Sequence, residues 1–219
     1  MKNIASILIL MTFIFSCSKT PESTLNLNTP VISKFFDSRE INELEKIVRF
    51  TDSLVIASTG IVNIDSAYHF YLDSIFEEHY ELGNPDALGL NHSLKVNLLS
   101  MIDSNLIEKI WLKPAPPSMV MTNDTVLYAP EGYPSLDLNN LGSYARLIEE
   151  LGKSDSVFHR INDHLTSTGG LGPLVIGNYP LHWHNKHNFN VAENRLWVAI
   201  FILTLEESVE TKVARYLSR

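Results

Sequence analysis

Three histidines within six residues form the densest group of chemically active side chains in this chain. They are His182, His184 and His187, in the run His-Trp-His-Asn-Lys-His. Imidazole nitrogens are common zinc ligands, and a loop that carries three of them could hold one ion. Such a site would be the basis of a metal-dependent hydrolase. The alternative is a polar loop in which Trp183 packs and the imidazoles are solvated or bonded to backbone, and we favour it.

The spacing of this run is similar to the His-x-His-x-Asp-His motif of metallo-β-lactamase-type hydrolases. Lys186 stands where that family has its aspartate ligand. Only residues 188–219 follow, they contain no histidine, and they have a helical pattern. The family instead places further ligands far downstream, on strands. We therefore reject membership of that family, and zinc remains a possible cofactor only at a site of another kind.

The remaining acidic and histidine groups are more typical of solvated helix faces. His159 and Asp163 are four residues apart, and we expect an exposed pair. Adjacent glutamates point in diverging directions on a helix and make poor acid–base pairs. The chain has no Gly-x-Ser-x-Gly nucleophile elbow and no phosphate loop. The same interpretation applies to residues 77–79, 149–150, His164 and 206–207, and the glycine-rich stretch 169–172 is expected to be a connector.

Aromatic side chains follow one another along the predicted second helix. At helical spacing, such a stripe is typical of a helix that faces the core. A groove for a small molecule or a peptide is the alternative, and we favour the core. The residues concerned are Tyr68, His69, Phe70, Tyr71, Phe76 and Tyr80.

The first seventeen residues have the pattern of an export signal. A short basic head with Lys2 precedes an apolar run at residues 4–15, which has the length of a signal h-region. Ser16 and Cys17, the only cysteine, follow. These residues resemble the signal peptide and lipobox of bacterial lipoproteins, although Phe15 replaces the usual small or aliphatic residue. The resemblance implies removal of residues 1–16, a diacylglycerol on Cys17 and a further acyl chain such as palmitate.

Composition and length bound the rest of the chain. Residues 17–33 are rich in Pro, Ser, Thr and Asn, and we predict a lipid-anchored flexible tether. Residues 34–219 have the size of a single domain. The net charge of −8 without a basic cluster argues against nucleic-acid binding. We expect a protein of the cell envelope, at the outer rather than the inner membrane, with its domain in the periplasm or on the cell surface.

The apolar run at residues 196–205 is predicted to be the central element. Thr204 is its only polar residue before Leu205, so a helix here has to be buried on all sides. It is too short to cross a bilayer. Asn190 and Glu193 predict a capping box at its start, which favours a helix over a buried strand. Val209, Val213, Tyr216 and Leu217 are predicted to continue the helical stripe.

The other elements predict a mainly α fold, an orthogonal bundle of six to seven helices around this C-terminal helix. Asp37 and Glu40 predict a capping box for the first helix, which Gly60 ends. Residues 119–122 and 125–128 flank Asn123-Asp124 and predict one small β-hairpin that leans on the helices. Residues 172–188 are predicted to be a long irregular connection.

As a whole the chain resembles small, acidic, largely helical lipoproteins of Gram-negative bacteria without assigned function. The resemblance rests on Phe35-Phe36-Asp37, the late glycine-rich turn and Leu203-Thr204-Leu205. It implies no catalytic residue. We therefore expect a non-catalytic binding or interaction module that contacts the membrane through its lipid and binds an unknown protein or small ligand. The alternative is a metal-dependent hydrolase that uses His182, His184 and His187.

Overall fold

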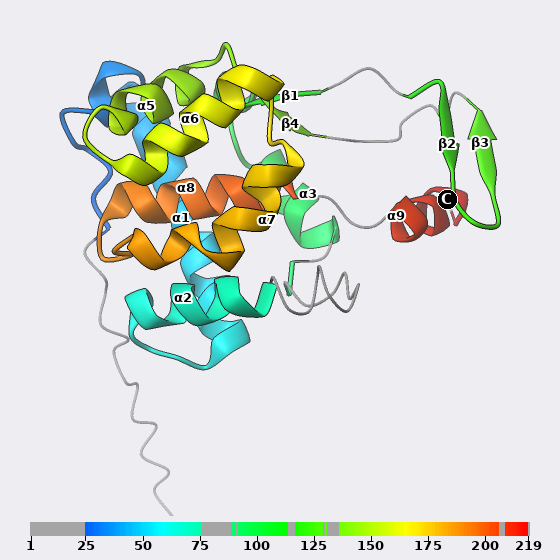
Figure 1. Ribbon diagram of the computed structural model, residues 1–219, viewed down its shortest axis with the longest axis horizontal. Helices are drawn as coiled ribbons and strands as arrows, with labels where there is room; N and C mark the ends of the chain where they lie inside the picture. Colours follow the sequence, from blue (N-terminus) through cyan, green and yellow to red (C-terminus); the bar gives the residue numbers. More distant parts are fainter. Residues whose placement is uncertain are drawn as a thin grey trace, which may run out of the picture.

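The computed structural model is mainly helical with a small β-hairpin, as the sequence predicts. It describes residues 25–75, 89–90, 92–113, 117–128, 130, 136–205 and 209–218. Within these residues it has nine α-helices, more than the six to seven predicted, and two short two-stranded sheets (Figure 1). The elements are η1 (Ile32–Lys34), α1 (Ser38–Thr59), α2 (Ile64–Ile75), α3 (His92–Ser100), α4 (Ser104–Ile110), β1 (Trp111–Leu112), β2 (Met119–Met121), β3 (Val126–Tyr128), β4 (Asp137–Leu138), α5 (Ser143–Gly152), α6 (Ser156–Thr168), α7 (Pro173–Leu181), η3 (Trp183–Lys186), α8 (Ala192–Thr204) and α9 (Val209–Leu217).

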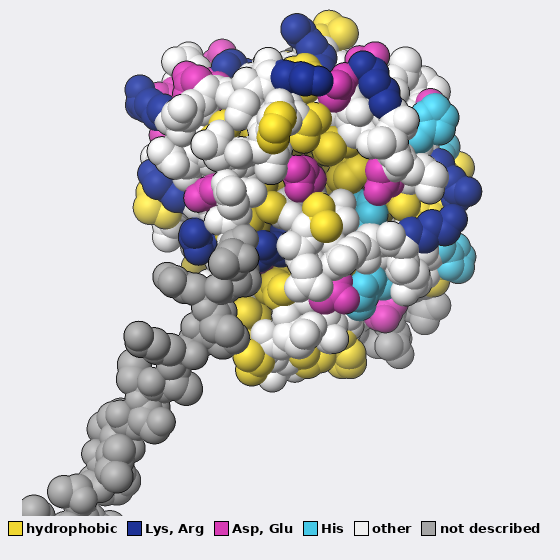
Figure 2. All heavy atoms as spheres, turned by 90° about the vertical axis from the view of Figure 1, so that its left-hand side faces the viewer, with side chains coloured by type: hydrophobic (Ala, Val, Ile, Leu, Met, Phe, Trp, Pro, Cys, Tyr) yellow, Lys and Arg dark blue, Asp and Glu magenta, His cyan; other side chains and the backbone are white. Residues whose placement is uncertain are grey.

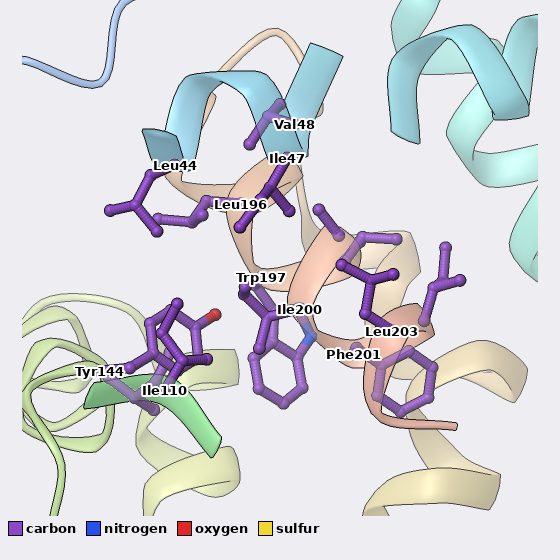
Figure 3. Close-up of a cluster of buried hydrophobic side chains, with 14 of the residues drawn as sticks. Leu44, Ile47, Val48, Ile110, Tyr144, Leu196, Trp197, Ile200, Phe201 and Leu203 are labelled. Atoms are coloured by element: carbon purple, nitrogen blue, oxygen red, sulfur yellow. The ribbon is translucent and has the colours of Figure 1, made fainter. Parts of the chain in front are cut away.

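The predicted central helix is α8, and it is buried along its whole length. Every residue of α8 except Glu193 is buried. Figure 1 shows α5 and α6 on one side of α8 and α2 on the other. In Figure 3, side chains of α1 lie beside Leu196, while Tyr144 of α5 and Ile110 of α4 lie on another side of the helix. The sequence therefore identified the core element correctly, and as a helix rather than a strand.

The start and the end of α8 differ from the prediction. Val191 is the N-cap residue and makes no side-chain cap, so the predicted Asn190–Glu193 capping box is wrong. The Asn190 amides instead donate to Asn188 Oδ1, in a turn that precedes the helix. The helix ends at Thr204, and the predicted stripe beyond it belongs to the separate helix α9. There Val213 is buried, whereas Val209 and Leu217 are exposed.

The first helix begins and ends at the predicted residues. Asp37 accepts from the backbone N–H groups of Arg39 and Glu40, and the Glu40 side chain accepts from the Asp37 N–H, which completes a capping box. Gly60 ends the helix with φ +69°, a left-handed conformation that glycine adopts without steric cost. Helix ends of this kind depend on neighbouring residues only, so the sequence alone predicts them.

The predicted long connection at residues 172–188 is wrong. It contains α7 and η3. Pro173 takes the first turn of α7, where its missing N–H is no loss. Gly177 and Pro180 lie within this helix. Both residue types are unfavourable in the interior of a helix, so the sequence pattern does not predict one here. Val175 and Tyr179 are fully buried, so burial against the core stabilises a helix that local propensity disfavours.

The predicted hairpin is confirmed, and one of its side chains, Val120, is buried. β2 and β3 pair antiparallel, and the Thr122 N–H donates to the Thr125 carbonyl across the turn. Figure 1 shows the pair standing to the side of the main helical body, near α9. A second sheet, β1 with β4, was not predicted, because two-residue strands carry no periodic signal.

The flexible tether predicted for residues 17–33 is wrong from residue 25 onward. Leu25 and Leu27 are buried, and Ile32 in η1 is fully buried. The Leu27 N–H donates to Glu45 Oε1 on α1, 3.0 Å away. Two leucines in a polar stretch were enough to fix the chain on the helices, so the folded domain includes residues 25–33. Cys17 and the rest of the predicted signal and tether lie outside the described residues.

No single helix in the described residues has both the length and the hydropathy of a membrane span. Only α1 taken together with α2 meets these criteria, and the two helices are bent by 71°.

We predict that Phe201→Ala lowers the free energy of unfolding by about 3–5 kcal/mol, because the buried ring leaves a cavity that its neighbours cannot fill. Ile200→Asp should cost more, since the carboxylate would be buried without a designed partner. Thermal and denaturant unfolding of the soluble form that lacks residues 1–20 measures both. The control is Glu210→Ala, at an exposed position of α9. Equal stability losses for Phe201→Ala and Glu210→Ala would contradict a central role for α8.

Candidate functional site

The structure does not bring the three histidines of the sequence motif together. His182 is exposed at the end of α7, while the side chains of His184 and His187 are fully buried. His184 faces α2, and His187 contacts Tyr179 of α7. Among the described residues, no group of three or more His, Cys, Asp or Glu side chains is placed to share a metal ion. The metal-dependent hydrolase stays a hypothesis that rests on sequence spacing alone.

His184 instead pairs with His69 on α2. The two Nδ1 atoms lie 3.0 Å apart, and the ring centroids 5.2 Å apart. The Nε2 atom of His184 lies 3.1 Å from Asp73 Oδ1. An ionised carboxylate can only accept, so Nε2 of His184 carries a hydrogen and donates it to Asp73. When His184 is neutral, its Nδ1 therefore accepts the hydrogen bond that His69 donates.

A second carboxylate lies at the other end of the pair. Nε2 of His69 is 3.8 Å from Asp65 Oδ1, one helical turn away on α2. The same oxygen accepts the backbone N–H of Phe189 at 2.6 Å. The Phe189 ring stacks on Tyr68 and meets His69 edge-on, each with a centroid distance of 4.9 Å. The contacts of the α7–α8 connection, residues 182–191, with α2 thus include the imidazole pair, the hydrogen bonds of His184 to Asp73 and of the Phe189 N–H to Asp65, and the Phe189 ring.

Burial sets the protonation of the buried imidazoles. It lowers the pKa of His184, an effect that Asp73 and the Pro180 carbonyl oppose and His69 reinforces. It lowers the pKa of His187 to about 4, with Asp155 opposing. Both rings are therefore neutral near pH 7. Burial also raises the pKa of Tyr179 well above its ordinary value, so the hydroxyl in contact with His187 stays protonated.

His187 occupies an apolar environment with one strong polar contact. Its Nδ1 lies 2.9 Å from the Tyr179 hydroxyl. Its Nε2 is buried without a hydrogen-bond partner among the described residues, and Asp155 Oδ1 is 4.0 Å away. The Phe158 ring packs beside it at a centroid distance of 5.0 Å. The position has the character of a core histidine. The predicted polar loop is therefore wrong for His184 and His187, which are buried against side chains rather than solvated, while Trp183 packs as predicted.

The histidine cluster, defined here as His69, His184, Asp65 and Asp73, joins α2 to the α7–α8 connection. The side chain of His69 is 26% exposed and that of Asp73 is 64% exposed, whereas the His184 side chain between them is buried. Figure 2 views the molecule from the side where the α7–α8 connection lies and shows histidine beside acidic side chains. The arrangement is a proton-sharing contact between two structural elements.

The other candidate residues of the sequence are scattered. His159 and Asp163 form the expected exposed pair, with a 3.5 Å separation. Glu150 binds Lys34 and Lys153 on the surface, and residues 77–79 and 206–207 lie outside the described residues. In the aromatic stripe Tyr68 and Tyr71 are buried in the core, as predicted, and Phe70 is 53% exposed; Phe76 and Tyr80 lie outside the described residues.

Sequence analysis missed the partner of His184. His69 lies 115 positions away and was noticed only as a member of the aromatic stripe. One signal was present, because Asp65, His69 and Asp73 follow a spacing of four and share one face of a helix. Nothing in the sequence, however, shows which element covers that face.

Three comparisons with known proteins find no match. No family model matches this chain, and neither does any curated protein or solved structure.

We predict that stability falls in acid because His187 is buried as the neutral imidazole. Its pKa is about 4 in the fold against 6.5 ordinarily, so the unfolded chain binds the proton first. Above pH 6.5 the buried neutral His187 has no effect on the pH dependence of stability. As the pH falls from 6.5 towards 4, the free energy of unfolding decreases by about 3 kcal/mol in total. Denaturant unfolding at a series of pH values should show this slope reduced in His187→Asn. His182→Asn, at an exposed position of the same connection, should follow the wild type; equal slopes for wild type and His187→Asn would contradict the prediction.

Proposed function

We propose that this chain is a bacterial lipoprotein of the cell envelope, anchored through a lipid on Cys17, whose helical domain is a non-catalytic interaction module. The residue pattern at positions 1–17 supports the anchor, and we favour the outer membrane. The observation that carries the interaction role is an apolar face on the hairpin of β2 and β3. We define this hairpin face as Met119, Met121, Val126 and Tyr128.

The register of the hairpin puts these four side chains on one side. Met119 is opposite Tyr128, and Met121 is opposite Val126, so both pairs project from the same face of the two strands. All four are exposed, Tyr128 at 77% and Met121 at 65%. Val120, on the other face, is buried. Apolar side chains gathered at an exposed site are typical of a surface that contacts another molecule.

The occupant that fits best is an extended segment of a partner protein. In a two-stranded sheet each strand has one outer edge, and an added strand can pair with the peptide groups there. Between Met119 and Tyr128 the only charged residue is Asp124, at the turn. The strands therefore lack the lysines, prolines and inward charges with which edge strands usually prevent pairing. Methionine side chains also adapt readily to different partner surfaces.

The anchor is tested by Cys17→Ser in the native bacterium. We expect loss of labelled palmitate, retention of residues 1–16 and loss of normal membrane fractionation. The matched control is the double variant Cys17→Ser with Ser23→Cys, which keeps one cysteine in the chain but moves it six residues away. It should also remain unlabelled. Palmitate on either variant would refute lipidation at Cys17.

The interaction role is tested by photo-crosslinking from position 128 in intact cells. A photoreactive phenylalanine analogue in place of Tyr128 should yield a discrete adduct with another protein. Met121→Lys should reduce that adduct at least about fivefold, because a lysine in the centre of an apolar contact costs more than about 1 kcal/mol of binding energy.

The control for this experiment is Met101→Lys. Met101 is 67% exposed, nearly the same as Met121, but it follows α3 rather than lying on the hairpin. It should leave the adduct unchanged. Equal loss in both variants would contradict a role for the hairpin face. An adduct with lipid alone, or with a second copy of this chain, would contradict the partner-protein proposal.

A further inference from the structure

We propose that His69 and His184 form a binding site for a divalent ion of the zinc class, with the Nδ1 atom of each ring as a ligand. The site differs from the run of His182, His184 and His187, which the fold does not bring together. It joins α2 to the α7–α8 connection. The inference goes beyond the interaction role, and it depends neither on the lipid anchor nor on the hairpin face.

The two imidazoles direct the same kind of nitrogen at each other. Their Nδ1 atoms lie 3.0 Å apart, although the residues are 115 positions apart in the chain. A tetrahedral zinc ion binds an imidazole nitrogen at about 2.0–2.1 Å, which places two such nitrogens about 3.3–3.4 Å from each other. A ring movement of a few tenths of an ångström therefore converts the contact into one edge of a tetrahedral site.

Each ring also has a carboxylate at its other nitrogen. Nε2 of His184 donates to Asp73 Oδ1 at 3.1 Å, and Nε2 of His69 lies 3.8 Å from Asp65 Oδ1. A histidine that binds a metal almost always donates its second N–H to a carboxylate, a carbonyl or water, which orients the ring and makes the ligand nitrogen more basic. A hydrogen bond between two imidazoles does not require this arrangement, whereas a metal site uses it.

The neutral pair can bind an ion without a change in its total number of protons. In the metal-free pair His184 carries its hydrogen on Nε2, and His69 donates from Nδ1 to Nδ1 of His184. The ion takes the place of that shared hydrogen. His69 loses the hydrogen on Nδ1 to water and gains one from water on Nε2, beside Asp65. Binding thus changes the tautomer of one ring only.

The site is open to solvent on one side. The side chain of His69 is 26% exposed, whereas that of His184 is buried. An ion can enter beside His69, where water can complete its coordination. In the part of the chain that the structure describes, no group of three or more His, Cys, Asp or Glu side chains is placed around one ion. Two protein ligands predict reversible binding rather than a permanent structural site.

The donor atoms select the class of ion. Imidazole nitrogens suit Zn²⁺, Cu²⁺ and Ni²⁺, whereas Mg²⁺ and Ca²⁺ prefer oxygen ligands. The Irving–Williams order gives Cu²⁺ a higher affinity than Zn²⁺ for the same nitrogen ligands. A bound ion would connect α2 to the segment that leads into the buried helix α8. Binding should therefore stabilise the folded chain by mass action.

Calorimetric titration with ZnCl₂ tests the site on the metal-free full chain in micelles of a non-ionic detergent. We expect one ion per chain, and an excess of MgCl₂ should not compete. Asp73→Asn should lower the zinc affinity about 10–100-fold, the usual cost of losing a carboxylate behind a histidine ligand. His69→Gln should lower it by more, because it removes one of the two ligands.

The matched controls have the same chemistry at other places. Asp163→Asn removes a carboxylate that is 61% exposed and 3.5 Å from His159, and Asp73 is similarly 64% exposed. His182→Gln removes an exposed histidine of the α7–α8 connection. Both variants should bind zinc as the wild type does.

Nitrogen-15 spectra of the histidine side chains identify the ligands in the wild type. Zinc should shift the Nδ1 signals of His69 and His184 and leave both Nε2 atoms protonated. If His69→Gln does not fold, these spectra decide. The proposal is overturned if the wild type binds no stoichiometric zinc, if His69→Gln binds it equally well, if Asp73→Asn and Asp163→Asn lose affinity equally, or if the zinc-dependent shifts fall on His182 or His187 instead.

Discussion

The need to bury α8 on every side determines how the rest of the chain is arranged. A helix of thirteen residues with no polar face has to be covered by other elements, because water would contact apolar side chains on any side left open. α1, α4, α5 and α7 supply that cover, and the Trp111 indole donates to Thr204 at the end of the helix. Burial of a large apolar side chain contributes about 1.5–3 kcal/mol, so this one helix brings much of the driving force for folding.

One charged residue in α8 restricts how the cover is arranged. Arg195 is 1% exposed, and its guanidinium donates to Asp52 Oδ2 of α1 at 2.9 Å. The Tyr68 hydroxyl of α2 donates to the other oxygen of Asp52 at 2.8 Å. Burial raises the pKa of Asp52 and the guanidinium opposes that shift. Buried pairs add little net stability, but breaking one costs about 3–5 kcal/mol. We infer that this network fixes the relative positions of α1, α2 and α8.

The histidine cluster follows from that arrangement. Tyr68 is fixed by Asp52, and its neighbour His69 then faces the segment that leads into α8. The contact joins two elements that the core has already placed. The hairpin face is independent of both, since its apolar side chains are exposed away from the core. The buried core, the histidine cluster and the hairpin face thus belong to different parts of the molecule.

The sequence by itself determined the features that depend on near neighbours. The Asp37 capping box, the glycine end of α1, the hairpin turn and the apolar run of α8 all lie within a few residues, and pattern alone identified them. The tertiary structure decided what depends on distant residues. α7 forms despite Gly177 and Pro180 because Tyr179 is buried, and Leu27 leaves the predicted tether because α1 offers it a partner. It also paired His184 with His69 rather than with His182, because imidazoles meet where packed helices place them and spacing along the chain does not record that contact.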